Sequence, residues 1–187
     1  MTSAAIAAVT EKIGIRAGSV VSPLHSVLRI AEEWSVVDNL SNGRVGISFA
    51  PGWQPNDFVL RPEAFQRRKD LMFEQIEQVR RLWRGEALPF ANAVGENVDV
   101  RILPRPVQKE LPVWVTIAGN PESFVAAARA GANVLTHLLG QTVKEVGEKV
   151  ALYRKTWREA GHPGSGSVTM MVHSFVGDSD DSVKDVV

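Results

Sequence analysis

The chain alternates between two hydrophobic periods. Short runs rich in β-branched residues predict strands at residues 13–21, 44–50, 113–118, 133–136 and 168–176. Between them, apolar residues that recur every three or four positions predict amphipathic helices at 22–41, 62–83, 121–130 and 142–160. The tail of one further helix is expected at 4–11 and the start of another at 178–187. Strands and helices that alternate in this way are typical of βαβ units and a parallel sheet.

Local signals mark the ends of these helices. Ser22 before Pro23 fits an N-cap followed by proline at the first helical position, and Pro62 opens the second helix. Thr142 and Glu145 fit a capping box at the start of the last long helix. The buried stripe of the first long helix is expected to comprise Leu24, Val27, Leu28, Ala31, Trp34 and Leu40.

The pattern breaks down over residues 86–112, which we interpret as an inserted hairpin and loop within a single domain of residues 1–187. A turn is expected near residues 94–97. Pro104, Pro106 and Pro112 exclude a helix from the second half of this insertion, because proline lacks the backbone N–H that a helix needs.

Charge and composition exclude several classes of partner and of chemical site. The chain has 21 Lys plus Arg and 21 Asp plus Glu, so its formal net charge is zero, which argues against nucleic-acid or membrane partners. It contains no cysteine, which excludes thiolate metal sites and cysteine nucleophiles. No apolar run approaches the ~20 residues that span a bilayer, and the first residues do not read as a secretory signal. We therefore expect a cytoplasmic protein.

Five parallel strands with helical crossovers leave two architectures open, a doubly wound sheet and a closed barrel. A complete (β/α)8 barrel needs ~250 residues. The 187 residues of this chain would hold about five strand–helix units of the usual size of ~35 residues. Sequence period alone does not separate the two architectures.

Several segments together resemble the bacterial luciferase-like flavin-dependent monooxygenases. They are residues 15–21 (IRAGSVV), 31–34 (AEEW), 42–46 (NGRVG) and 113–122 (VWVTIAGNPE). The run 48–58 (SFAPGWQPNDF) is similar to the branch of that family found in polyketide and nonribosomal-peptide assembly lines, and residues 103–108 and 133–141 add to the match. The resemblance covers nearly the whole chain.

The resemblance implies an α/β fold in which this chain is a partial (β/α)8 TIM barrel. By the family register it would hold strands three to seven and lack the first two and the last. It implies reduced FMN as cofactor and O2 as co-substrate. It also implies a small or carrier-protein-bound substrate and a separate flavin reductase as partners.

The turn between the third strand and its helix is the best candidate for cofactor binding. A helix begins within three residues of the strand end, and its first turn offers free N–H groups that suit a phosphate. By the resemblance, Gly119, Asn120 and Ser123 match positions that hold the flavin phosphate. The alternative is that Asn120 is only an N-cap and Pro121 a helix starter.

Two further candidates follow the first and second strands. By the resemblance, Ser19 lies along the flavin ring, and Trp53 could cover the flavin or bind substrate. The alternatives are a serine that merely ends a strand and an aromatic side chain that merely packs in a proline-rich turn.

The four histidines have no metal-site spacing, so no metal is expected. His25 and His137 follow strand ends on the expected active-site face and are weak catalytic candidates. His173 is expected to pack inside the fifth strand, and His162 is expected to be exposed in a Gly-Pro turn.

A second class of function remains open. The chain could be a catalytically silent barrel fragment or an interaction module, since five strands cannot close an eight-stranded barrel. Two open sheet edges favour self-association or pairing with the missing barrel segments.

Overall fold

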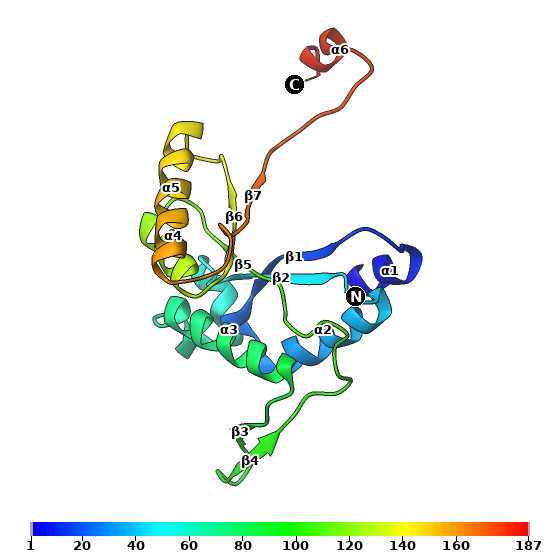
Figure 1. Cartoon of the computed structure of the whole chain (residues 1–187), viewed down its shortest axis with the longest axis vertical. Helices are drawn as coiled ribbons and strands as arrows, with labels where there is room; N and C mark the ends of the chain where they lie inside the picture. The colour runs from blue at the N-terminus through cyan, green and yellow to red at the C-terminus, as the bar shows by residue number, and fades with distance from the viewer. Residues whose placement is uncertain (1, 187) are drawn as a thin grey trace.

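The computed structural model describes residues 2–186 and is built around one parallel sheet (Figure 1). The strand order is β1-β2-β5-β6-β7, so spatial neighbours follow one another as they do in the chain. The bounds of these strands are β1 Ile15–Val21, β2 Val45–Ala50, β5 Val113–Thr116, β6 Asn133–His137 and β7 Val168–Met171. All four pairings are parallel. The five strands predicted from the sequence are therefore confirmed.

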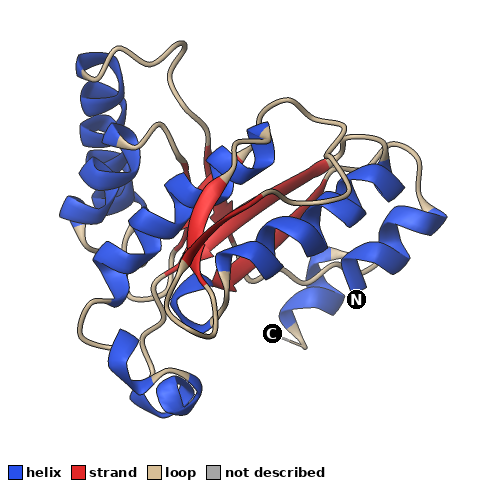
Figure 2. Ribbon diagram, turned by 90° about the horizontal axis from the view of Figure 1, so that it is seen from below, coloured by secondary structure: helices blue, strands red, loops and turns tan. Residues whose placement is uncertain are grey.

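The helices that connect the strands lie along one side of the sheet, whereas the last helix stands apart from it (Figures 1 and 2). The helices are α1 Thr2–Val9, α2 Val27–Ser41, α3 Arg68–Arg84, α4 Pro121–Arg129, α5 Val143–Glu159 and α6 Asp180–Lys184. Short 3-10 turns span Ser22–Leu24, Pro55–Leu60 and Pro62–Ala64. The predicted capping box is present at α5, where the Thr142 and Glu145 side chains each bond the other residue's backbone N–H.

The two faces of the sheet differ because side chains alternate along a strand. One face packs on the helices and carries the core, with Val45, Ile47 and Phe49 of β2 fully buried. The opposite face carries more polar side chains, among them Ser48 of β2 and Thr116 of β5. In each pair of strands, the register places core-facing residues beside core-facing residues and polar-face residues beside polar-face residues.

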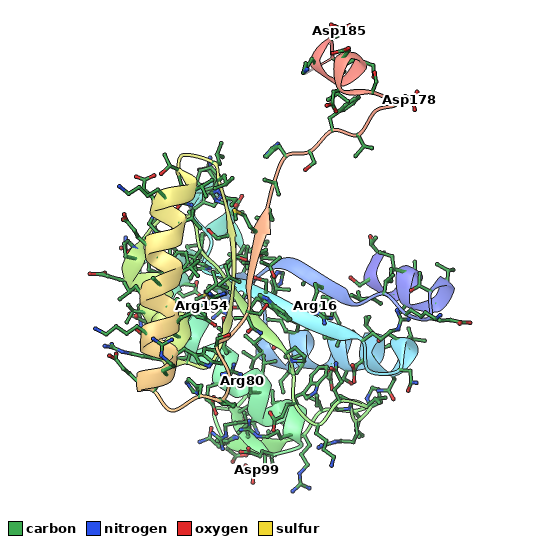
Figure 3. The ribbon with its side chains drawn as sticks, turned by 45° about the horizontal axis from the view of Figure 1, so that its top comes forward. Arg16, Arg80, Asp99, Arg154, Asp178 and Asp185 are labelled. Carbon is green, nitrogen blue, oxygen red and sulfur yellow. The ribbon has the colours of Figure 1, made fainter. Side chains whose placement is uncertain are left out.

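The sheet curls toward its polar face. Neighbouring strands lie about 4.8 Å apart, so residues on β1 and β5 would be about 10 Å apart in a flat sheet. Yet Ser19 of β1 hydrogen-bonds Thr116 of β5 across β2. The Arg16 guanidinium stacks 5.1 Å from the centroid of the Trp114 ring on the same two strands (Arg16 is labelled in Figure 3). The polar face is therefore concave.

The insertion contains the predicted hairpin. β3 Leu88–Ala91 and β4 Asn97–Val100 pair antiparallel and extend away from the main sheet (Figure 1). The following loop returns to α2, where the fully buried carboxylate of Asp38 accepts bonds from Gln108 N and Nε2 at 2.9 and 2.7 Å. These bonds anchor an irregular segment that has no ladder of its own.

The predicted starts of two helices were wrong. Ser22 and Pro23 form a 3-10 turn, the chain then becomes extended at His25, and α2 begins only after Ser26. Ser22 Oγ has no hydrogen-bond partner among residues 2–186, so it does not cap a helix. Pro62 likewise opens a 3-10 turn, and α3 begins at Arg68. Proline suits the first turn of either helix type, so it marks a turn without fixing where an α-helix starts.

Other predictions fail at the surface and at the last strand. Leu40, predicted to lie on the buried stripe of α2, is 52% exposed. β7 ends at Met171, which pairs with the last residue of β6, so His173 lies beyond it and is exposed rather than packed. From there the chain runs out to α6, and Asp178 and Asp185 lie far from the sheet in Figure 3. Val187 lies outside the described residues.

No helix within residues 2–186 combines the length and apolar character needed to cross a bilayer. The same residues hold no group of three or more histidine or acidic side chains arranged to bind a metal ion.

Candidate functional site

A cavity of about 620 Å³ opens at the carboxyl ends of β1, β2, β5 and β6. Its lining is mostly apolar and comprises Ser19, Val21, Ala50, Pro51, Gly52, Trp53, Thr116, Ala118, His137 and Leu139. Ligand sites in α/β proteins with parallel strands concentrate at this end of the sheet. Three of the predicted site residues, Ser19, Trp53 and His137, are thus brought together.

A chain of hydroxyl groups forms the polar side of the cavity. Thr116 Oγ1 lies 2.7 Å from Ser48 Oγ and also hydrogen-bonds Ser19 Oγ, so three adjacent strands are linked through one side chain. Ser48 and Thr116 face the concave side through the alternation of their strands, and Ser19 joins them because β1 has an irregularity between Gly18 and Val20 that adds one residue. Each hydroxyl can donate and accept, so the group can adapt to either kind of ligand atom.

Trp53 stands at the mouth of the cavity. Its side chain is 77% exposed, so it does not pack inside the turn as the simpler interpretation required. Gly52 precedes it with a φ of +78°, and a methyl group there would lie 2.9 Å from Phe58 and from Val21. Arg68 Nε donates to Gly52 O at 3.2 Å. The backbone that carries Trp53 is therefore fixed while its ring is free to contact a ligand.

The turn before α4 adjoins this cavity. Asn120 and Ser123 line a second space of about 220 Å³, which shares Thr116 and Pro51 with the first. Asn120 Oδ1 accepts from Glu122 N at 2.9 Å, and Ser123 N donates to Asn120 O at 3.1 Å. Asn120 is therefore an N-cap, as one of the two interpretations held. Gly119 and the Ser123 hydroxyl are the groups of this turn left to meet a ligand.

The two candidate histidines, His25 and His137, line different spaces. His137 lines the large cavity, and its Nδ1 is buried without a hydrogen-bond partner among residues 2–186. His25 lines other spaces, beside α2 and α3, and its carbonyl accepts from Gln75 Nε2 at 3.3 Å. His25 therefore does not share the cavity with His137, contrary to the expectation of a common active-site face. His162, expected to be exposed, is half-buried against Trp157, and its Nε2 lies 3.1 Å from Arg129 O.

Sequence reasoning missed four polar residues at this end of the sheet. They are Ser48, Thr116, Thr136 and Gln141. Thr136 Oγ1 and Gln141 Nε2 both donate to Ala118 O, at 3.3 and 2.7 Å. The signal for Ser48 and Thr116 lay in the alternation of β2 and β5, where a hydroxyl recurs among β-branched and aromatic residues. No short-range pattern pointed to Gln141, because its partners lie on two different strands.

Comparison with protein families gives one match over the full chain. The family model described as luciferase-like monooxygenase matches residues 1–187. Among curated proteins, pyrimidine monooxygenase RutA of Cronobacter turicensis is 33% identical over 128 residues, which cover 66% of this chain and 33% of that protein.

Solved structures show the same fold. Monooxygenase RslO1 from Streptomyces bottropensis superposes with a TM-score of 0.85 and 26% identity, covering 98% of this chain and 56% of that chain. The oxygenating constituent of 3,6-diketocamphane monooxygenase from Pseudomonas putida, solved with FMN, gives a TM-score of 0.80. Its identity is 15%, with 98% of this chain and 54% of that chain covered, so that likeness shows the fold alone. The chain spans about half the length of the first curated relatives it matches, with 56% of their length covered.

Proposed function

The chain belongs to the luciferase-like monooxygenase family, and from this premise we propose that it is a flavin-dependent monooxygenase, or a part of one, that uses reduced FMN and O2. The observation that carries the proposal is the cavity at the carboxyl ends of β1, β2, β5 and β6. It joins an apolar wall to hydroxyl groups, and it shares Pro51 and Thr116 with the smaller space at the first turn of α4.

We propose that the sheet is the wall of a partial (β/α)8 barrel, corresponding to family strands three to seven. Three observations support this. The strands follow chain order without the reversal found in a doubly wound sheet. The helices that connect the strands lie along one side (Figure 2). The sheet also curls toward the other side, as the contact of Ser19 with Thr116 across β2 indicates.

The residues present fit a flavin. The cavity of about 620 Å³ lies within the ~300–1,000 Å³ typical of cofactor and small-molecule sites. Ser19 and Thr116 would orient the polar edge of the ring, and His137 Nδ1 is a buried polar atom that still needs a partner. Gly119 and Ser123 would hold the phosphate at the first turn of α4, where the helix dipole favours negative charge.

The protein's share of the chemistry is orientation and exclusion of water. When bound in reduced form, the flavin supplies the electrons that activate O2, and one oxygen atom is transferred to the substrate. Val21, Pro51 and Leu139 line the cavity with apolar surface, which keeps competing solvent away from the reacting groups. Trp53 at the mouth would close over the ring or the substrate.

The substrate we propose is a small organic molecule, free or attached to a carrier protein of a natural-product assembly line. The run 48–58, which resembles that branch of the family, supports this choice. The exposed Trp53 at an open cavity mouth suits a substrate delivered on a flexible arm. A separate flavin reductase would provide the reduced cofactor.

The alternative of a catalytically silent fragment or interaction module is less favoured. The relatives that match include monooxygenases, such as RutA among curated proteins and RslO1 among solved structures. The cavity also retains polar groups that a purely structural sheet has no need to leave without partners, such as His137 Nδ1.

The experiment that tests the proposed function mixes anaerobic reduced FMN and protein with O2 and follows the flavin absorbance. We expect the 187-residue chain to change the time course of flavin oxidation relative to free reduced FMN, saturably with protein. A reduced deazaflavin, which reacts poorly with O2, serves as the control cofactor. A time course identical to that of free reduced FMN at every protein concentration would contradict the proposal.

A further inference from the structure

One side chain ties together the ends of two strands directly behind the proposed phosphate turn. Gln141 Nε2 donates to Ala118 O after β5 at 2.7 Å and to His137 O at the end of β6 at 2.9 Å. Thr136 Oγ1 adds a second bond to Ala118 O at 3.3 Å. The carbonyl that precedes Gly119 is therefore held by two side chains instead of a sheet ladder.

Lys149 and the two carbonyls together fix which way the Gln141 amide faces. Its Nζ donates to Gln141 Oε1 at 2.6 Å. An ammonium group can only donate, so the amide oxygen must turn toward Lys149, and the NH2 group then turns toward the two carbonyls. The two orientations of a glutamine amide have nearly the same shape, so they differ in energy only through the hydrogen bonds they make.

The backbone of Gln141 is fixed on both sides. On the preceding side, Gly140 adopts a φ of +70° and Gln141 N donates to Leu138 O at 3.1 Å, which closes a turn. A positive φ of this kind favours glycine. On the following side stands Thr142, the N-cap of α5, which is held by its capping box. The amide thus acts from a rigid support.

The amide packs directly behind the turn that precedes α4. A methyl group added to Gly119 would lie 3.6 Å from Gln141 Cδ and Oε1, which is van der Waals contact. The position of Gly119, and with it the first turn of α4, therefore depends on where Gln141 holds Ala118 O.

We propose that Gln141 is a positioning residue that aligns residues 119–123 for the phosphate of FMN, with Lys149 holding the oxygen of its amide. This inference rests on the proposed function. It makes Gln141 and Lys149 determinants of the preference for FMN over riboflavin, which lacks the phosphate but carries the same ring.

The test compares the dissociation constants of oxidised FMN and riboflavin for the 187-residue chain and for the Gln141→Glu variant. Glutamate has the same shape and still accepts from Lys149, but it faces the two carbonyls with an acceptor. We expect the preference for FMN over riboflavin to fall roughly tenfold, the value of about one well-made hydrogen bond, while riboflavin binding changes little. Both ligands bind only the folded protein, so the ratio of their dissociation constants does not change if the variant is less stable.

Two variants of Lys149 provide the matched controls. Lys149→Gln keeps a donor for Gln141 Oε1 and should retain the preference for FMN. Lys149→Glu removes the donor and places a carboxylate against Gln141 Oε1, which repels the amide from its position and should lower the preference as Gln141→Glu does. If Lys149→Gln lost the preference as fully as Lys149→Glu, charge and not the hydrogen bond to the amide would be the cause, which would overturn the role assigned to Lys149.

The remaining outcomes separate this inference from the proposed function. Failure of the wild-type chain to bind FMN would contradict the proposed function itself. Equal wild-type affinity for FMN and riboflavin would overturn the assignment of the phosphate turn. A preference for FMN that survives Gln141→Glu, or an equal weakening of both ligands, would overturn the positioning role alone.

Discussion

Single residues at the strand ends determine what the cavity can bind. Thr116 is the clearest case, because its one hydroxyl contacts both Ser19 and Ser48 on neighbouring strands. Removing it would leave the buried Ser48 hydroxyl without its partner, which costs about 1–3 kcal/mol, whereas the exposed Ser19 hydroxyl can bond water instead. The residue therefore serves both the fold and the site.

The pKa of Tyr153 reports whether its hydroxyl is buried. This residue is the only tyrosine in the chain, and its fully buried hydroxyl donates to Ala132 O at 3.0 Å. Burial raises its pKa from 10.0 to about 12. The protonated hydroxyl of Tyr153 therefore stabilises the folded state fully below pH 10. This stabilisation is lost as the pH rises toward 12, because the unfolded state releases the proton at a lower pH than the folded state does.

We expect the ultraviolet absorbance of phenolate to appear with a midpoint near pH 12 in the folded protein and near pH 10 in denaturant. Tyr153→Phe, which removes this signal, is the control. A folded-state midpoint at pH 10 would show that the hydroxyl is not buried as described.

At the scale of elements, one buried carboxylate helps to anchor the inserted segment 86–112. Asp38 on α2 accepts two hydrogen bonds from Gln108 and is fully buried. We expect Asp38→Ala to lower the free energy of unfolding by about 1–3 kcal/mol, because Gln108 N loses its acceptor and Gln108 Nε2 keeps only Val45 O. Glu32→Ala, on the exposed face of the same helix, should change it by less than about 0.5 kcal/mol. Urea denaturation of both variants measures the difference, and equal midpoints would refute the anchoring role.

The elements themselves were largely predictable, and the site only in part. The alternation of periods fixed five strands and the hairpin, since burial on one face imposes a period that a single sequence displays. Helix starts failed at Ser22 and Pro62, where proline allows a 3-10 turn as readily as an α-helix. The position of His25 failed because a 3-10 turn and an extended residue separate the strand end from α2. Gln141 escaped notice because its two acceptors become neighbours only when β5 and β6 pair.

At the scale of the whole molecule, β1 and β7 are open edges. The exposed edge strand β7 carries Met170 and Met171 at 40% and 43% exposure, and an unpaired edge with apolar side chains invites association. We propose that the isolated chain self-associates or pairs with other barrel segments through these edges. The proposal follows from five strands being too few to close a barrel.

We expect sedimentation velocity to show concentration-dependent association of the 187-residue chain. Met170→Lys should reduce it by adding charge to the edge, whereas Glu148→Lys on the exposed face of α5 should not. A single monomeric species at all concentrations, with a high melting temperature, would contradict the proposal.

The most direct test of the account is calorimetric titration of the chain with FMN, carried out on the wild type and on the variants Thr116→Val and Ser123→Ala. The account predicts one site per chain, with affinity lowered about three- to thirtyfold by either variant, because each removes one hydroxyl from the proposed ring or phosphate contacts. A third variant, Ser165→Ala in an exposed turn far from the cavity, should bind as the wild type does. A folded wild-type chain that fails to bind FMN, or that binds it with unchanged affinity in both site variants, would contradict the flavin site described here.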